Sequence, residues 1–106
     1  MEAYKVWQQF LIRLPKAIKY NLGSEIDSLF REIIKLLFKA SYLHKELKLP
    51  IIQQAIEKFD LLKFFIQLAW ELKSFDDKKY ILISTHLDEI GKMLWGWKNQ
   101  LSKTPR

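Results

Sequence analysis

The stretch Leu87-Asp88-Glu89-Ile90-Gly91-Lys92-Met93-Leu94-Trp95-Gly96-Trp97 guides the interpretation of the whole chain. Its large apolar residues recur, together with Leu101, at spacings of three and four, which predicts an amphipathic helix. Each of its two glycines costs about 1 kcal/mol relative to alanine in a helix interior. Glycine is tolerated in a helix interior most readily where a close neighbour occupies the space that a Cβ would fill. We therefore expect this segment, with its two tryptophans, to pack tightly.

The composition is that of one folded helical domain over residues 1–106. Hydrophobic residues make up 49% of the chain, which is too apolar for a disordered protein. Three glycines and three prolines leave room for only short connections, so long helices are favoured. The chain has no cysteine, which excludes disulfides and thiolate metal sites. With no signal-peptide pattern at its start and lysines interrupting every apolar run, it is expected to be cytoplasmic.

The apolar periodicity predicts four helices, over residues 4–14, from 16–24 to about 44, over 50–73 and over 77–102. Pro15 ends the first and Pro50 opens the third, at the position where proline suits a helix. A helical turn at Lys16–Tyr20 is expected to feed the second helix; a break capped by Ser24 is the alternative. Asp76 is the expected N-cap of the fourth. Short connections make neighbours antiparallel, so the prediction is an all-α up-down four-helix bundle with a short first helix.

The second and third helices carry more apolar surface than one small bundle can bury. Each shows two apolar faces, whereas an amphipathic helix needs little more than about 100° of its circumference. The second faces would be large exposed patches on a monomer, so the sequence predicts a homo-oligomer. The alternative is that the short first helix covers them. The predicted interface residues are Phe30, Ile34, Phe38, Leu61, Phe64, Phe65, Leu68 and Trp95.

A formal charge of +6 favours a polyanionic partner. Arg31, Lys35 and Lys39 recur every four residues, which aligns three cations on one side of the second helix. Such a line neutralises phosphates without reading bases. The alternative is a solvated helix face partly balanced by Glu25 and Glu32. The predicted nucleic-acid-binding residues are Arg31, Lys35, Lys39, Lys16, Lys19, Lys92 and Lys98.

No residue pattern points to catalysis or to a metal site. The chain has two histidines, His44 and His86, and no Glu-x-x-His motif of the kind that di-iron bundles use. No arginine precedes a histidine closely, as it does in small helical ribonucleases of the HEPN type. Phosphate-binding glycine loops and nucleophile elbows are missing from the sequence as well. We therefore expect a protein that is not an enzyme and uses no cofactor.

The stretch from Leu87 to Trp97 resembles the terminal-helix signature of the "four helix bundle protein" family. Weaker matches are Pro15-Lys16, Leu22-Gly23 and Lys79-Tyr80, so the resemblance covers nearly the whole chain in order. The family includes the accessory variability determinant proteins of diversity-generating retroelements. It also includes proteins encoded in intervening sequences of bacterial large-subunit ribosomal RNA genes.

The resemblance implies a homopentameric, barrel-like assembly with a basic surface. That assembly would bind a reverse transcriptase and nucleic acid, RNA or DNA, and support mutagenic reverse transcription, with the polymerase chemistry in the partner. The ribosomal branch of the family implies an alternative, an oligomeric scaffold with no polymerase partner. The cation line of the second helix is not a family motif, so its predicted role in binding rests only on the spacing of its residues.

Overall fold

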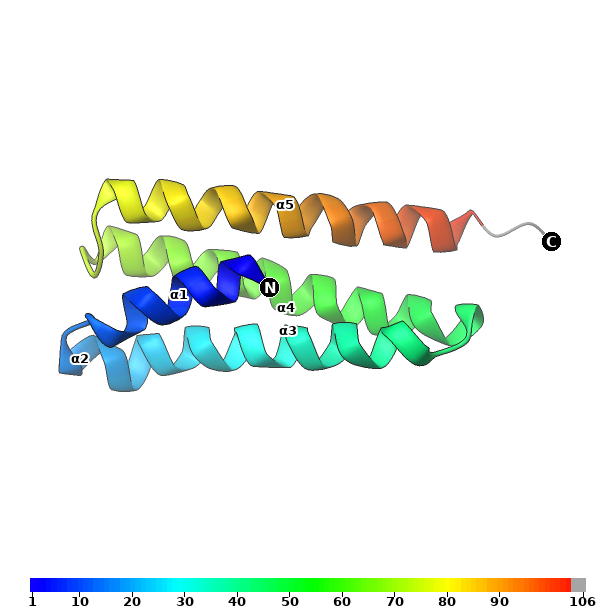
Figure 1. Ribbon diagram of the computed structural model, residues 1–106, viewed down its shortest axis with the longest axis horizontal. Helices are drawn as coiled ribbons and strands as arrows, with labels where there is room; N and C mark the ends of the chain where they lie inside the picture. Colours follow the sequence, from blue (N-terminus) through cyan, green and yellow to red (C-terminus); the bar gives the residue numbers. More distant parts are fainter. Residues whose placement is uncertain (104–106) are drawn as a thin grey trace.

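The computed structural model describes residues 1–103 and shows an all-helical bundle elongated to 52 × 21 × 19 Å (Figure 1). The segments α2, η1 (a π-helical turn) and α3 run on without a break, because the residues at both junctions have helical backbone angles. The described residues thus form four helices packed antiparallel, with a short first one, as predicted. The elements are α1 (Glu2–Ile12), α2 (Lys16–Ile18), η1 (Lys19–Gly23), α3 (Ser24–Tyr42), α4 (Lys45–Glu71) and α5 (Asp77–Ser102).

The core lies between α3, α4 and α5, which pack side by side along the long axis of the molecule (Figure 1). The first apolar face predicted for α4 is buried throughout, from Ile52 to Ala69. Ile83, Leu87, Ile90 and Leu94 are the buried residues of α5, which confirms the helical periodicity of the segment quoted at the outset.

The short helix α1 lies over the groove between α3 and α5 and covers only part of its length (Figure 1). It buries Ala3, Trp7 and Phe10, which follow one another at spacings of four and three. The ring of Trp7 stacks on that of Phe30 at 6.1 Å, and Tyr4 contacts the same ring at 5.5 Å. Helix α1 therefore closes the bundle at the end where α3 begins.

Several helix boundaries differ from the prediction by two residues or more, and two of them have a clear local cause. Helix α1 ends at Ile12 instead of Leu14, because Arg13 and Leu14 bond to carbonyls three residues back and tighten the last turn. Helix α4 begins at Lys45, so Pro50 lies inside it and not at its start. Proline removes one bond of that helix, from its own nitrogen to the carbonyl of Glu46, and the helix continues through it. The predicted N-cap of α5 is confirmed, since the Asp76 carboxylate accepts a hydrogen bond from the backbone N–H of Lys79 at 2.9 Å.

The two glycines of α5 have different surroundings. A Cβ on Gly91 would lie 3.2 Å from Cε2 of the buried Phe59 ring, so this glycine permits a close approach of α5 to α4. A Cβ on Gly96 would meet no atom within 4 Å. The expectation of tight packing is right for Gly91 and wrong for Gly96 within the protomer, where the neighbouring Trp95 and Trp97 are exposed.

Replacing each glycine by alanine is expected to separate these two environments. Gly96→Ala should raise the free energy of unfolding by up to about 1 kcal/mol, because alanine favours the helix and the space beside it is open. Gly91→Ala should gain less or lose stability, because the new methyl group presses on Phe59 in a close-packed interior. Urea unfolding at low protein concentration measures the difference. Equal stabilities of the two variants would contradict the packing of α5 on α4.

Candidate nucleic-acid interface

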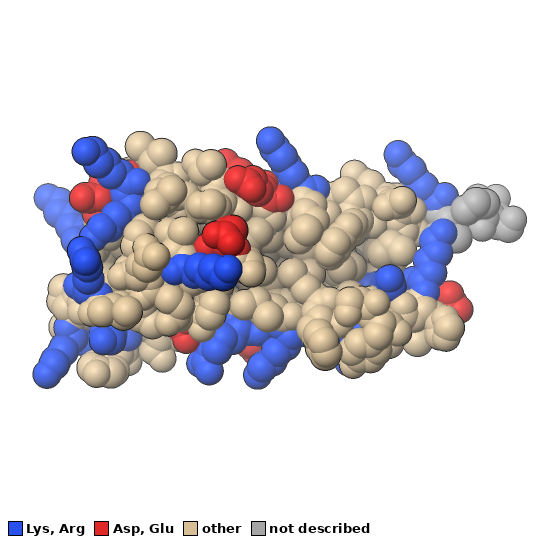
Figure 2. Space-filling model, viewed as in Figure 1, with Lys and Arg blue, Asp and Glu red and all other residues tan. Residues whose placement is uncertain are grey.

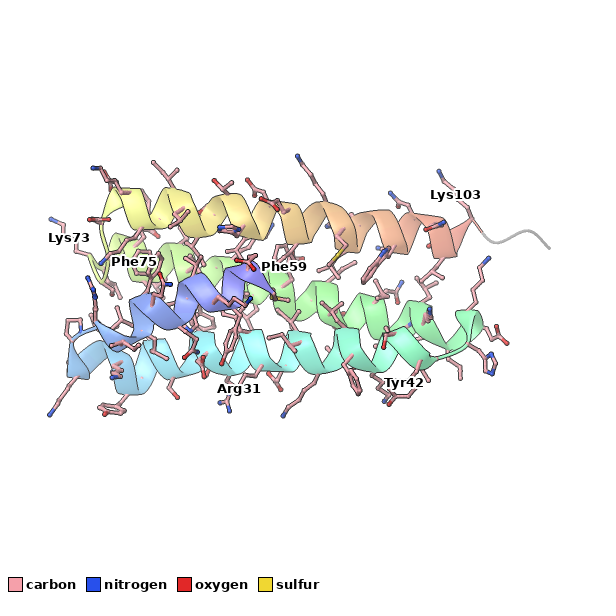
Figure 3. All side chains as sticks on the ribbon, in the orientation of Figure 1. Arg31, Tyr42, Phe59, Lys73, Phe75 and Lys103 are labelled. Atoms are coloured by element: carbon pink, nitrogen blue, oxygen red, sulfur yellow. The ribbon has the colours of Figure 1, made fainter. Side chains whose placement is uncertain are left out.

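The predicted cation line is exposed along the outer edge of α3. Arg31, Lys35 and Lys39 are all exposed and follow one another at intervals of one helical turn. Figure 2 shows Lys and Arg side chains projecting from this edge, and Figure 3 shows Arg31 pointing away from the other helices. The line therefore faces solvent over about two turns.

Acidic groups compensate only the beginning of this line. The Nε of Arg31 lies 3.2 Å from Oδ2 of Asp27, one turn earlier. Glu32, which could offset the charge of the line, instead pairs with Lys58 of α4 at 3.7 Å. Within residues 1–103, neither Lys35 nor Lys39 forms an ion pair. Two of the three cations are thus left to an external anion.

The Asp27 carboxylate fixes the start of the line by joining α1 to α3. Its Oδ1 accepts hydrogen bonds from Nε1 of Trp7 at 3.3 Å and from Nε2 of Gln8 at 2.8 Å. Burial, followed by the hydrogen bond to Asp27, raises the pKa of the neighbouring Tyr4 phenol. Hydrogen bonds to an ionised group are among the stronger ones in proteins. Asp27 therefore both docks α1 and orients Arg31.

Two exposed aromatic rings continue the cation line towards the end of α3. Phe38 is 70% exposed and Tyr42 is 66% exposed, and their rings meet edge to face at 5.7 Å between centroids. Figure 3 shows Tyr42 on the same outer edge as Arg31. Sequence reasoning could not separate exposed aromatic residues from buried ones, because α3 carries both kinds at helical spacing.

Lys16 and Lys19 lie in a second basic patch, at the end of the bundle where α1 turns into α2. The turn between α4 and α5 lies at the same end, and Figure 2 shows basic side chains gathered there. Arg13 and Lys79 line one hollow at this end. Four cations at this end of the bundle were not among the predicted binding residues: Arg13, Lys73, Lys78 and Lys79. Their positions beside two connections of an antiparallel bundle were the available signal.

Lys92 and Lys98 lie in a third region, on the side where α5 faces α4. Lys92 lines a groove with Lys63, Phe59 and Trp95. The Nζ of Lys98 lies 4.5 Å from the centroid of the Trp95 ring, a cation–π contact. One protomer therefore distributes the seven predicted cations over three patches and does not bring them into one surface.

The predicted interface residues also separate into distinct environments. Phe30 is completely buried and its ring packs against Trp7 of α1. Ile34 is half-buried on the same helix. On the outside of α4 an apolar stripe is left uncovered; Leu61 and Phe64 in it are exposed, and Phe65 and Leu68 are half-buried. The first helix thus covers only the beginning of the second face of α3, at Phe30, and leaves Phe38 and the stripe on α4 exposed.

Residues 1–103 contain no group of three or more His, Asp and Glu side chains placed to hold a metal. In the same part of the chain, no helix combines the length and apolar character required to cross a membrane.

Comparison with protein-family models, with curated proteins and with solved structures finds no match for this chain.

Proposed function

We propose that the protein is a non-enzymatic accessory subunit that binds nucleic acid and a reverse transcriptase, as in a diversity-generating retroelement. The observation that supports nucleic-acid binding is the line of three exposed cations on α3, two of them without an acidic partner within residues 1–103. The resemblance of Leu87 to Trp97 to the terminal helix of the "four helix bundle protein" family supports the reverse-transcriptase partner.

The nucleic-acid part of the proposal is tested by the salt dependence of binding. Fluorescence anisotropy with labelled 20-nucleotide RNA and DNA should give an affinity that falls linearly with the logarithm of salt concentration. If the cation line alone contacts phosphates, the slope should be about −2 to −3, because each neutralised phosphate contributes about −0.7 to −0.9. Binding that does not change with salt, or no binding at low salt, would contradict the proposal.

Self-association through the outer stripe of α4 is the second part of the proposal. Leu61, Phe65, Leu68 and Leu72 follow one another at spacings of four, three and four, the pattern of a helix face that packs on another helix. Leu72 is 58% exposed at the end of this stripe. Such a continuous apolar line is costly to leave in water, so a second copy of the chain is the proposed cover, in a pentamer if the resemblance holds.

Sedimentation is expected to detect this assembly and its loss. The wild-type protein should sediment as a multiple of 12.8 kDa, and the double variant Leu61→Lys/Phe64→Lys as a folded monomer, because two charges would enter the apolar contact. Ile12→Lys is the control, since Ile12 is 73% exposed, more than Leu61 at 42% or Phe64 at 58%, and lies on α1. If the wild-type protein sediments as a monomer at micromolar concentration, the proposed self-association is wrong.

The polymerase partner is tested independently of nucleic acid. A neighbouring gene for a reverse transcriptase, together with a repeated variable target, would support the retroelement assignment. Co-purification of the two proteins after nuclease treatment would then establish direct contact. If both genes were missing from the neighbourhood, the alternative of a scaffold of the ribosomal intervening-sequence type would be favoured.

A further inference from the structure

The outer edge of α3 combines the two chemistries that single-stranded nucleic acid requires. Arg31, Lys35, Phe38 and Tyr42 are spaced by four, three and four residues, so they follow one line along the helix. All four are exposed. Two cations are thus followed within two turns by two aromatic rings, and Lys39 lies one turn beyond Lys35.

The two rings are not part of the core. Helix α1 covers Phe30, two turns earlier on α3, but its described path does not reach Phe38. The edge-to-face contact between Phe38 and Tyr42 orients the rings against each other and leaves most of both surfaces in solvent. Because exposed aromatic area is unfavourable in water, an exposed pair of this kind indicates a surface that binds a ligand.

The neighbours of the pair favour nucleic acid over a second protein chain. Lys35 and Lys39 flank the rings, and neither has an acidic partner in residues 1–103. Charged residues, lysine above all, are depleted at the centre of protein interfaces. The stripe on α4 differs, because its residues Leu61, Phe64, Phe65 and Leu68 are all apolar and lie at helical spacing on one side of that helix. The two exposed apolar regions therefore suit different partners.

We infer that the outer edge of α3 binds single-stranded nucleic acid in preference to a duplex. Unpaired bases stack on Phe38 and Tyr42, while Arg31, Lys35 and Lys39 hold the adjacent phosphates. A duplex offers the phosphates but keeps its base faces inside the stack, so only a single strand uses both parts of the surface. Stacking does not depend on base identity, so no sequence preference follows. This inference rests on the proposed binding of nucleic acid to the cation line.

The double variant Phe38→Leu/Tyr42→Leu tests the stacking step, because leucine keeps an apolar side chain and removes the ring. Affinity for a 12-nucleotide single strand and for the duplex of the same sequence is measured by anisotropy at several salt concentrations. We expect a loss of about tenfold or more for the single strand, since one stacked base contributes about 1–3 kcal/mol. Duplex affinity should stay within about twofold, and the salt slope for both should be unchanged, because the phosphate contacts remain.

The control is Tyr20→Leu, which removes another exposed ring, 72% accessible, from outside α3 and should leave single-strand affinity unchanged. An equal loss for the single strand and the duplex, or no loss for either, would overturn stacking but leave nucleic-acid binding intact. A change in sedimentation without a selective single-strand loss would assign the rings to self-association and also overturn it. If reversal of Arg31, Lys35 and Lys39 leaves binding to both ligands unchanged, the proposed function itself fails.

Discussion

Replacing Arg31, Lys35 and Lys39 together by glutamate is expected to weaken nucleic-acid binding by about 100-fold or more near 0.1 M salt. Each cation that neutralises a phosphate contributes roughly fivefold in affinity at that concentration through counterion release, and reversal adds repulsion. The salt slope should fall by about 2 to 3 at the same time. Anisotropy with labelled RNA and DNA over a salt series measures both quantities.

A control of equal charge is needed, because each substitution removes two units and the formal net charge falls from +6 to zero. The variant Lys5→Glu/Lys63→Glu/Lys78→Glu makes the same change at exposed positions on α1, α4 and α5. Its loss should be several-fold smaller, as expected for general attraction by net charge. If both triple variants bind equally weakly, the total charge and not the α3 line carries the affinity.

Trp7→Ala is expected to lower the unfolding free energy by about 3–5 kcal/mol, the range for removal of a large buried aromatic side chain. The side chain is completely buried, stacks on Phe30 and donates a hydrogen bond to Asp27, so its removal leaves a cavity and an acceptor with one partner fewer. At about 4–8 °C per kcal/mol for a domain of this size, Tm should fall by at least about 12 °C.

Two other tryptophan variants complete this experiment. Trp7→Phe keeps the ring contact and loses only the donor, so it should cost about 1–2 kcal/mol. Trp95→Ala should change stability by less than about 1 kcal/mol, because that ring is 45% exposed. A cost below 1 kcal/mol for Trp7→Ala in urea unfolding would mean that α1 is not docked on α3 as described.

Local signals in the sequence were sufficient for most of the fold. Asp76 caps α5 as predicted, because a carboxylate followed by a long periodic segment satisfies a free N–H at the helix start. Pro50 misled the prediction for α4. A proline fits the first turn best, but six residues from the helix start it costs a single backbone bond, which the buried face of a 27-residue helix easily outweighs.

Which apolar residues stay exposed could not be read from spacing. Phe30 and Phe38 are eight residues apart and belong to one face of α3. The length and direction of α1 alone decide that Phe30 is covered and Phe38 is not. The same holds for Gly91 and Gly96, which look alike in the sequence and differ in whether α4 passes close by. Tertiary contacts, and not helical periodicity, separate the members of each pair.

The cations show a similar limit. The helical repeat of α3 predicted which of its basic residues share an edge, because Arg31, Lys35 and Lys39 lie on one continuous helix. Arg13 and Lys79 are far apart in the sequence and line one hollow only because two turns come together at one end of the bundle. Patches built from one element were predictable, and patches built from several were not.

The most direct test of the α3 edge as the nucleic-acid interface is a map of the bound surface. Amide chemical shifts of the ¹⁵N-labelled protein are followed while an unlabelled 12-nucleotide single strand is added. We expect the largest changes on residues 31–42 and small changes in α4. Largest changes around residues 13–19 and 73–79, or no change at saturating ligand, would contradict this expectation.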